Sequence, residues 1–183
     1  VPVTEEGEGA LFLQVNRNKR SIELDPGSDA HREVMRRLIA TADVIVVNVP
    51  DSALLKMGLD YETVSAIRPD IILANISSFG PTGPWADRPG FDSVGQAMCG
   101  SAYLSGPGDV PYRSPITWVD HTAALYAAFG VMAALFERTS TGRGQQVSAN
   151  LLGAALACSS TYLIEQAATQ PDRVAIGNRS FVN

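Results

Sequence analysis

Two uninterrupted apolar runs, separated by one segment with helical periodicity, constrain the fold of this chain more than any other feature. Residues 44–47 are Val-Ile-Val-Val and residues 71–74 are Ile-Ile-Leu-Ala, while residues 52–67 between them show helical spacing with an interruption near Gly58. Continuous runs of this kind are typical of strands buried on both faces of a parallel sheet. A strand, a helix and a second strand in this order form a right-handed βαβ unit. The sequence therefore predicts an α/β fold with a parallel sheet and flanking helices.

Further elements are predicted on both sides of this unit. Residues 21–24 have the composition of a short strand, and Ser28 is a suitable cap for a helix over residues 28–41. Downstream, the pattern predicts helices over 92–98, 123–136 and 151–168, and a strand over 145–148. The connection between Gly80 and Pro115 is rich in glycine and proline, and long connections in a compact domain usually carry function.

Asparagine residues stand at the ends of both buried strands, at Asn48 and Asn75. Ligands of open α/β sheets bind beyond the carboxyl ends of the strands, so a binding site is expected there. Asparagine also shapes turns without binding anything. These two interpretations stay open from the residues alone.

One carboxylate, Asp120, precedes the apolar helix predicted over residues 123–136. Aspartate is a preferred N-cap residue because its oxygens accept hydrogen bonds from the amides of the first helical turn. The same place favours an ionised carboxylate that faces a ligand, and carboxylates also serve as covalent nucleophiles. Local sequence does not choose between a cap and a nucleophile.

Composition and spacing exclude several classes of function. The chain has 14 basic and 19 acidic residues and a net charge of −5, whereas nucleic-acid binding requires lysine and arginine to neutralise phosphates. We therefore expect no nucleic-acid partner. No Gly-x-Gly-x-x-Gly turn follows a strand, which disfavours a nicotinamide-dependent dehydrogenase. Cys99, Cys158, His31 and His121 lack the spacing of metal ligands, so no metal site is predicted.

The apolar run at residues 123–136 is shorter than the ~20 residues that span a bilayer. No membrane association is therefore predicted. Two distant cysteines and the lack of a hydrophobic signal segment favour a reducing, cytoplasmic location.

A series of short segments then leads to a family. In order along the chain they are Asn-Arg-Asn-Lys-Arg-Ser-Ile at 16–22, Ala-Asp-Val at 42–44 continuing to Asn48, Ala-Leu-Leu-Lys-Met-Gly at 53–58, Ser-Phe-Gly-Pro-Thr-Gly-Pro at 78–84, Gly-Phe-Asp at 90–92 with Gln-Ala at 96–97, Asp120, and Thr-Gly-Arg-Gly-Gln at 141–145. With these segments the chain resembles the family III CoA-transferases (CaiB/BaiF family), which include formyl-CoA:oxalate and carnitine CoA-transferases.

The resemblance implies a Rossmann-like parallel sheet that holds CoA, in a large domain that belongs to an interlocked homodimer. Family members are about twice as long as this chain. Residues 1–183 are therefore expected to form a single but incomplete large domain, without the opening strand and the second, smaller domain of the family.

The resemblance also makes Asp120 the catalytic residue. In the family pattern this carboxylate attacks the acyl-CoA thioester and gives a mixed anhydride and free CoA, after which an aspartyl-CoA thioester forms and the acceptor acid takes the CoA. The implied substrates are an acyl-CoA and a small carboxylic acid, and no tightly bound cofactor is expected.

Residues expected to bind CoA are carried over from the same resemblance: Leu24, Gly27, Asn48, Val49, Pro50, Lys56, Pro89, Gly90, Phe91 and Asp92. The chain departs from the family pattern at three of its positions. Val49 stands where many relatives have phenylalanine, Lys56 replaces a common arginine, and Leu11 replaces a tyrosine found in some transferases. Lysine keeps the charge of arginine but loses its bidentate fork.

Two other functions compete with CoA transfer. The α-methylacyl-CoA racemases resemble this chain in fold but need an acid/base pair at the substrate α-carbon. Their histidine lies in a Gly-His-Asp motif, and Phe91 occupies that position here, which disfavours racemisation. The second alternative is a CoA-binding module without chemistry, in which Asp120 only caps its helix.

Overall fold

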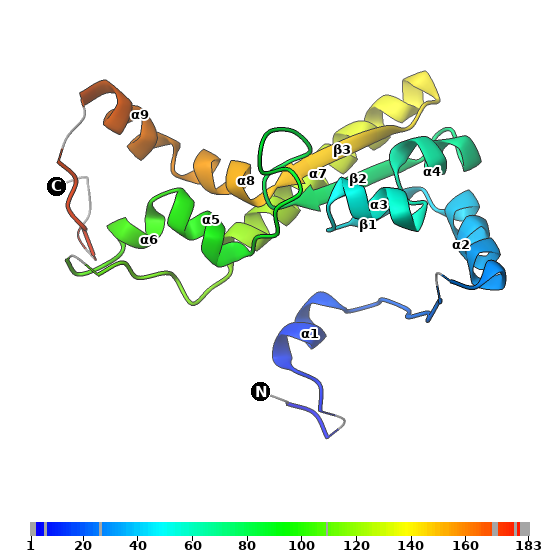
Figure 1. Ribbon diagram of the computed structural model, residues 1–183, viewed down its shortest axis with the longest axis horizontal. Helices are drawn as coiled ribbons and strands as arrows, with labels where there is room; N and C mark the ends of the chain where they lie inside the picture. Colours follow the sequence, from blue (N-terminus) through cyan, green and yellow to red (C-terminus); the bar gives the residue numbers. More distant parts are fainter. Residues whose placement is uncertain are drawn as a thin grey trace. The chain divides into compact units, whose positions relative to one another are not determined.

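The computed structural model describes residues 3–5, 7–25, 27–108, 110–169, 172–177 and 179. The chain divides into two units, residues 1–35 and residues 36–183 (Figure 1). We describe each unit by itself.

The first unit contains helix α1 (Ala10–Val15) and the beginning of helix α2 (Asp29–Thr41). The strand predicted over residues 21–24 does not form, because these residues have no regular secondary structure. An isolated strand leaves its backbone donors and acceptors without partners. In the described part of residues 1–35, no strand lies alongside to supply them.

The second unit is built on a three-stranded parallel sheet in the order β1-β2-β3, with β1 at Val44–Val47, β2 at Ile72–Ser77 and β3 at Gln145–Asn150 (Figure 1). Both pairings are parallel, and Val44 pairs with Ile72, which in turn pairs with Gln145. Ile72, Leu73 and Ala74 are fully buried because β2 is the central strand. The predicted parallel α/β fold is confirmed.

Two short helices connect β1 to β2. The helix predicted over residues 52–67 consists of α3 (Asp51–Met57) and α4 (Tyr61–Ile67), which separate at Gly58 as predicted. Gly58 has a φ of 65°, a left-handed conformation that glycine adopts without strain. Each helix contributes one buried side chain to the core, Leu54 from α3 and Val64 from α4.

The remaining helices are α5 (Asp92–Met98), α6 (Ser101–Leu104), α7 (Trp118–Thr141), α8 (Leu151–Cys158) and α9 (Ser160–Thr169). Helix α5 agrees with its prediction. Helix α7 extends well beyond residues 123–136 at both ends, and the helix predicted over 151–168 breaks at Ser159.

Helix α7 packs against β2 and β3 through small residues. Ala123, Ala127 and Ala134 are buried. A β-carbon added at Gly130 would lie 2.7 Å from Cγ1 of Val147, so the helix backbone runs very close to β3. With 24 residues, α7 is long and apolar enough to cross a bilayer by length and composition alone. The length of the apolar run at residues 123–136 is therefore not an argument against membrane association. Packing against the sheet accounts for the apolar residues on one face of the helix.

Four charged side chains join the C-terminal part of α7 to the beginnings of the strands. Arg68 contacts Asp43 at 2.8 Å and Asp70 at 3.0 Å. Arg138 of α7 contacts the same two carboxylates at 3.2 Å and 3.6 Å, and it donates to the Asp70 carbonyl oxygen at 3.1 Å. Because each acid is shared by two arginines, the network fixes this end of α7 against β1 and β2.

The turn between α7 and β3 supplies a stability test with a matched pair of glycines. Gly142 ends α7 with a φ of 67° and open space around it, whereas a β-carbon at Gly144 would lie 1.8 Å from the Ile71 carbonyl oxygen. We expect Gly144→Ala to lower the free energy of unfolding by about 3 kcal/mol or more, because β3 must move away from β2. Gly142→Ala should cost only about 1 kcal/mol of left-handed strain. Urea unfolding of both variants measures the difference, and equal losses would contradict this close approach.

Candidate active site around Asp120

A cavity of about 380 Å³ opens where the carboxyl ends of β1 and β2 meet the first turn of α7. It is lined by Asn48, Ile76, Ser77, Ser78, Gly90, Phe91, Asp120, Ala124 and Leu151. Four of the residues predicted to form the site, Asn48, Gly90, Phe91 and Asp120, are therefore brought together from three separate segments of the chain. The cavity lies at the edge of the sheet where a ligand site was expected.

Asp120 lies in the first turn of α7, but it is not the N-cap. The helix begins at Trp118, and Thr117 occupies the N-cap position. Among the described residues, no hydrogen bond reaches the Asp120 carboxylate, although its backbone amide is bonded. The capping interpretation is therefore wrong, and the carboxylate is left available to the cavity.

The surroundings of Asp120 raise the pKa of its carboxyl group above the ordinary value. Partial burial beside the cavity wall is the largest cause, because it disfavours the charged form. The neighbouring carboxylate of Asp92 raises the pKa further, and His121 acts in the opposite direction. No other residue that lines this cavity carries a titratable side chain.

Asp92 is directed into the protein and not into the cavity. It is 4% exposed, and its Oδ1 accepts hydrogen bonds from the backbone amides of Val119 at 2.8 Å and Asp120 at 3.4 Å. Its Oδ2 accepts a third bond, at 2.6 Å, from Nε2 of Gln96. A direct contact with CoA was predicted for Asp92, but this structure uses its carboxylate internally.

The other predicted CoA contacts differ in where they lie. Gly90 and the exposed Phe91 line the cavity. The Ser78 hydroxyl donates a hydrogen bond of 3.0 Å to the Gly90 carbonyl oxygen. Pro89 is exposed beside them. The contacts predicted for Val49, Pro50, Lys56, Leu24 and Gly27 remain predictions, since none of the five lines this cavity. Pro50 is the N-cap residue of α3, Lys56 lies exposed in the last turn of α3, and Leu24 and Gly27 belong to the first unit.

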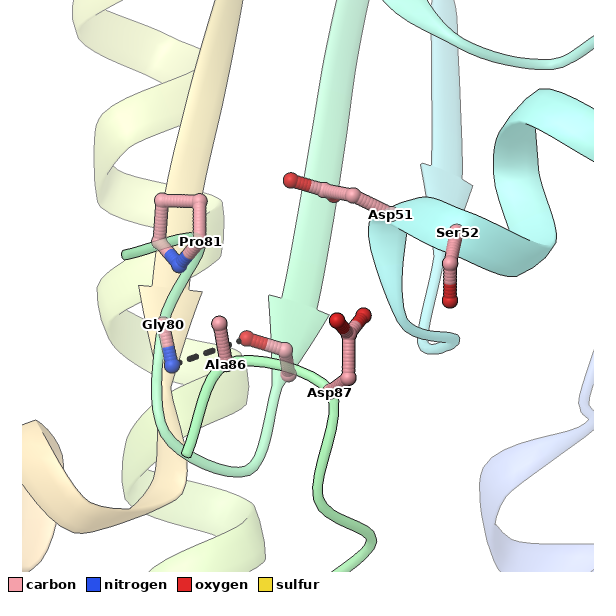
Figure 2. Close-up of a pocket in the computed structure, with 7 residues that line it drawn as sticks. Asp51, Ser52, Gly80, Pro81, Ala86 and Asp87 are labelled. Carbon is pink, nitrogen blue, oxygen red and sulfur yellow. Dashed lines mark hydrogen bonds between the residues drawn. The ribbon is translucent and has the colours of Figure 1, made fainter. Parts of the chain in front are cut away.

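Sequence reasoning missed a second, acidic pocket of about 240 Å³ that shares Ser77 with the cavity. Figure 2 shows Asp51 and Ser52 of α3 on one side of it and Asp87 on the other. Asp51 Oδ1 accepts a hydrogen bond of 2.6 Å from the buried Asn75 side chain. Two carboxylates that line the same pocket disfavour the binding of anionic groups there. The sequence did not predict this pocket because Asp51 and Asp87 lie far apart along the chain.

A third cavity, of about 520 Å³, lies wholly within the first unit. It is lined by Glu8, Phe12, Leu13, Asn16, Arg17, Lys19, Arg20 and Ser21. Three cationic side chains next to apolar ones form a surface that suits an anionic ligand with an apolar part.

A model of the family described as CoA-transferase family III matches residues 1–183. The succinyl-CoA:glutarate CoA-transferase of Mus musculus is 37% identical over 164 residues, which is 87% of this chain and 38% of the relative. A formyl-CoA:oxalate CoA-transferase of Rhodopseudomonas palustris is 37% identical over 160 residues, 87% of this chain and 37% of the relative. The crystal structure of a CAIB/BAIF family protein from Brucella suis superimposes with a TM-score of 0.87 at 35% identity, covering 96% of this chain and 47% of that one. The chain thus spans less than half the length of these proteins.

The raised pKa of Asp120 gives a pH-dependent stability test. A carboxyl group whose pKa is higher in the folded than in the unfolded state loses stability as the pH rises through its folded pKa. Asp120→Asn removes this ionisation, so its melting temperature should rise relative to the unsubstituted protein between about pH 4 and neutrality. Thermal unfolding across this range measures the shift. A relative fall over the same range would show that the ionised carboxylate stabilises the fold.

Proposed function

This chain belongs to CoA-transferase family III, and we propose on that premise that the protein transfers CoA from an acyl-CoA thioester to a carboxylic acid, with Asp120 as the covalent carrier. The observation that supports this most strongly is a carboxylate without internal hydrogen bonds, among the described residues, at the wall of a 380 Å³ cavity. Relatives named for transfer of CoA between acids agree with it.

The proposed reaction balances without an external proton donor. An oxygen of Asp120 attacks the thioester carbon, the C–S bond breaks, and CoA leaves as a thiolate from a mixed anhydride. The thiolate then attacks the Asp120 carbonyl carbon and releases the donor acid, which leaves an aspartyl-CoA thioester. The acceptor carboxylate attacks this thioester to give a second anhydride. Attack of the thiolate on the acceptor's carbonyl carbon then forms the product and restores Asp120.

Each step passes through a tetrahedral oxyanion that needs hydrogen-bond donors. Two possible donors line the cavity, the side-chain amide of Asn48 and the hydroxyl of Ser77. The Ser77 oxygen already accepts a bond of 3.0 Å from the Gly80 amide, so its own proton is free to point at a substrate. We assign these two side chains to the oxyanion.

For the remainder of CoA we retain the residues named from the family pattern, Leu24, Gly27, Val49, Pro50 and Lys56. Within the first unit, Arg17, Lys19 and Arg20 by themselves suit phosphate groups, because arginine and lysine form charge-assisted hydrogen bonds with phosphate oxygens. The acidic pocket beside Ser77 disfavours those phosphates.

The cavity does not favour racemisation. Proton transfer at an α-carbon needs two titratable groups, one on each face of the substrate. Asp120 is the one such group among the cavity residues, and Phe91 stands where the racemases have histidine. His121 does not line the cavity, and its Nδ1 lies 2.7 Å from the Thr117 carbonyl oxygen.

We also propose that the protein acts as a homodimer through the outer face of α7. Leu125, Phe129, Met132 and Phe136 are 64–79% exposed and recur at alternating intervals of four and three residues. This spacing places them in one line along the helix, and a line of this kind packs well against its own symmetric copy. A second copy of this chain is therefore the proposed partner.

Trapping of intermediates tests the role of Asp120. After incubation with an acyl-CoA and quenching with hydroxylamine, the peptide that contains Asp120 should carry a hydroxamate detectable by mass spectrometry. Asp120→Asn should lose the adduct and reduce the transfer rate at least about a thousandfold, as removal of a covalent nucleophile does. Glu137→Gln, a carboxylate at the other end of α7, is the control and should leave both unchanged. Full activity of Asp120→Asn without an adduct would reject the proposal.

Charge on the outer face of α7 tests the dimer. We expect Phe129→Glu to convert dimers into folded monomers in sedimentation at micromolar concentration, because a dimer would bury the new charge. Thr141→Glu, at an exposed position of the same helix that does not continue this spacing, should leave the dimer intact. A monomeric parent protein, or binding of the parent to phospholipid vesicles that Phe129→Glu abolishes, would show that the dimer is wrong.

A further inference from the structure

Two buried side chains of α5 hold the start of α7. Asp92 and Gln96 lie one turn apart on α5 and are 4% and 1% exposed. Asp92 receives the backbone amides of Val119 and Asp120. It thereby takes the place of a side-chain cap, since Thr117 at the N-cap forms no such bond.

Gln96 fixes the segment that leads into α7. Its Oε1 accepts the Ser114 amide at 2.7 Å, and its Nε2 donates to the carbonyl oxygens of Ser114 at 3.4 Å and Ile116 at 3.3 Å. The bond from the Ser114 amide sets the orientation of the Gln96 amide group. Nε2 must then face Asp92, so Asp92 has to accept hydrogen bonds with both of its oxygens.

The two helices also touch closely at this point. A β-carbon added at Gly95 would lie 2.8 Å from Cγ1 of Val119, the residue before Asp120. Val119 is fully buried. This close packing leaves no room for α5 and α7 to slide past each other, so packing and hydrogen bonds together fix the first turn of α7.

We infer that Asp92 and Gln96 are positioning residues that fix the first turn of α7 so that the Asp120 carboxylate faces the cavity. This inference rests on the proposed function, in which that carboxylate is the nucleophile. Neither side chain needs to contact the substrate.

Asp92 has an electrostatic effect besides its hydrogen bonds. Its carboxylate raises the pKa of Asp120, in addition to the larger effect of partial burial, and His121 lowers it. These are the charged or titratable groups that act on Asp120 from the described elements around it. The acidic limb of the pH–rate profile should therefore lie at a higher pH than it would for an aspartate with an ordinary pKa.

Asparagine cannot replace Asp92 without loss. If its oxygen accepts the Val119 amide, its NH₂ group meets Nε2 of Gln96, and two donors face each other. Asp92→Asn should lower kcat about tenfold or more with little change in KM for acyl-CoA. It should also move the acid limb of the pH–rate profile to lower pH, because one negative charge is gone.

A second variant separates the two effects. Gln96→Met removes the bonds to residues 114–116 but keeps the charge of Asp92, so kcat should fall while the acid limb stays in place. The matched control is Asp60→Asn. Asp60 also accepts a first-turn amide, from Thr63 at 3.0 Å, but it caps the distant helix α4. This control should affect stability alone.

The experiment measures pH–rate profiles of all three variants and, independently, the titration of the ¹³C-labelled Asp120 carboxyl group by NMR. A lower Asp120 pKa in Asp92→Asn, with no shift in Asp60→Asn, supports the inference. Unchanged kcat in Gln96→Met, or an unchanged Asp120 titration in Asp92→Asn, overturns it. If no variant and no parent protein transfers CoA, the proposed function fails, while the NMR titration still decides whether Asp92 acts on Asp120. If Asp92→Asn does not fold, kcat of Gln96→Met decides.

Discussion

The close approach of α7 to the sheet is the constraint on which the rest of this structure depends. Its inward face consists of Ala123, Ala127, Gly130 and Ala134, which let the helix backbone run against β2 and β3. Small residues there leave the large apolar side chains of the helix to point outward. The same helix therefore packs into the core of the unit and presents an exposed apolar surface on its other face.

The two ends of α7 are anchored by different chemistry, and this sets what each end can do. Near its C-terminus, Arg138 joins Asp43 and Asp70 at the beginnings of the strands. At its N-terminus, Asp92 holds the first turn beside the carboxyl ends of the same strands. The helix therefore spans the sheet from one edge to the other, and it delivers Asp120 to the edge where α/β proteins bind ligands.

Local pattern predicted the parts of this chain whose structure depends on near neighbours. The runs at 44–47 and 71–74 formed parallel strands because continuous burial leaves a β-branched segment few alternatives. The strand predicted at 21–24 failed because pairing depends on a partner that sequence does not show. The resemblance to the family predicted that Asp120 lies at a ligand site. That Asp120 does not cap α7 depends on Asp92, whose carboxylate accepts a hydrogen bond from the Val119 amide 27 positions away. Local sequence patterns do not predict a hydrogen bond between residues so far apart in the chain.

Isotope transfer tests the central claim, that Asp120 carries the transferred group, most directly. In the proposed cycle the acceptor acid gives one carboxyl oxygen to the anhydride, and that oxygen stays on Asp120 when the product forms. A single turnover with ¹⁸O-labelled acceptor should therefore place one ¹⁸O atom in the Asp120 peptide, as mass spectrometry measures. Formation of the acyl-CoA product with no ¹⁸O in that peptide would contradict the account.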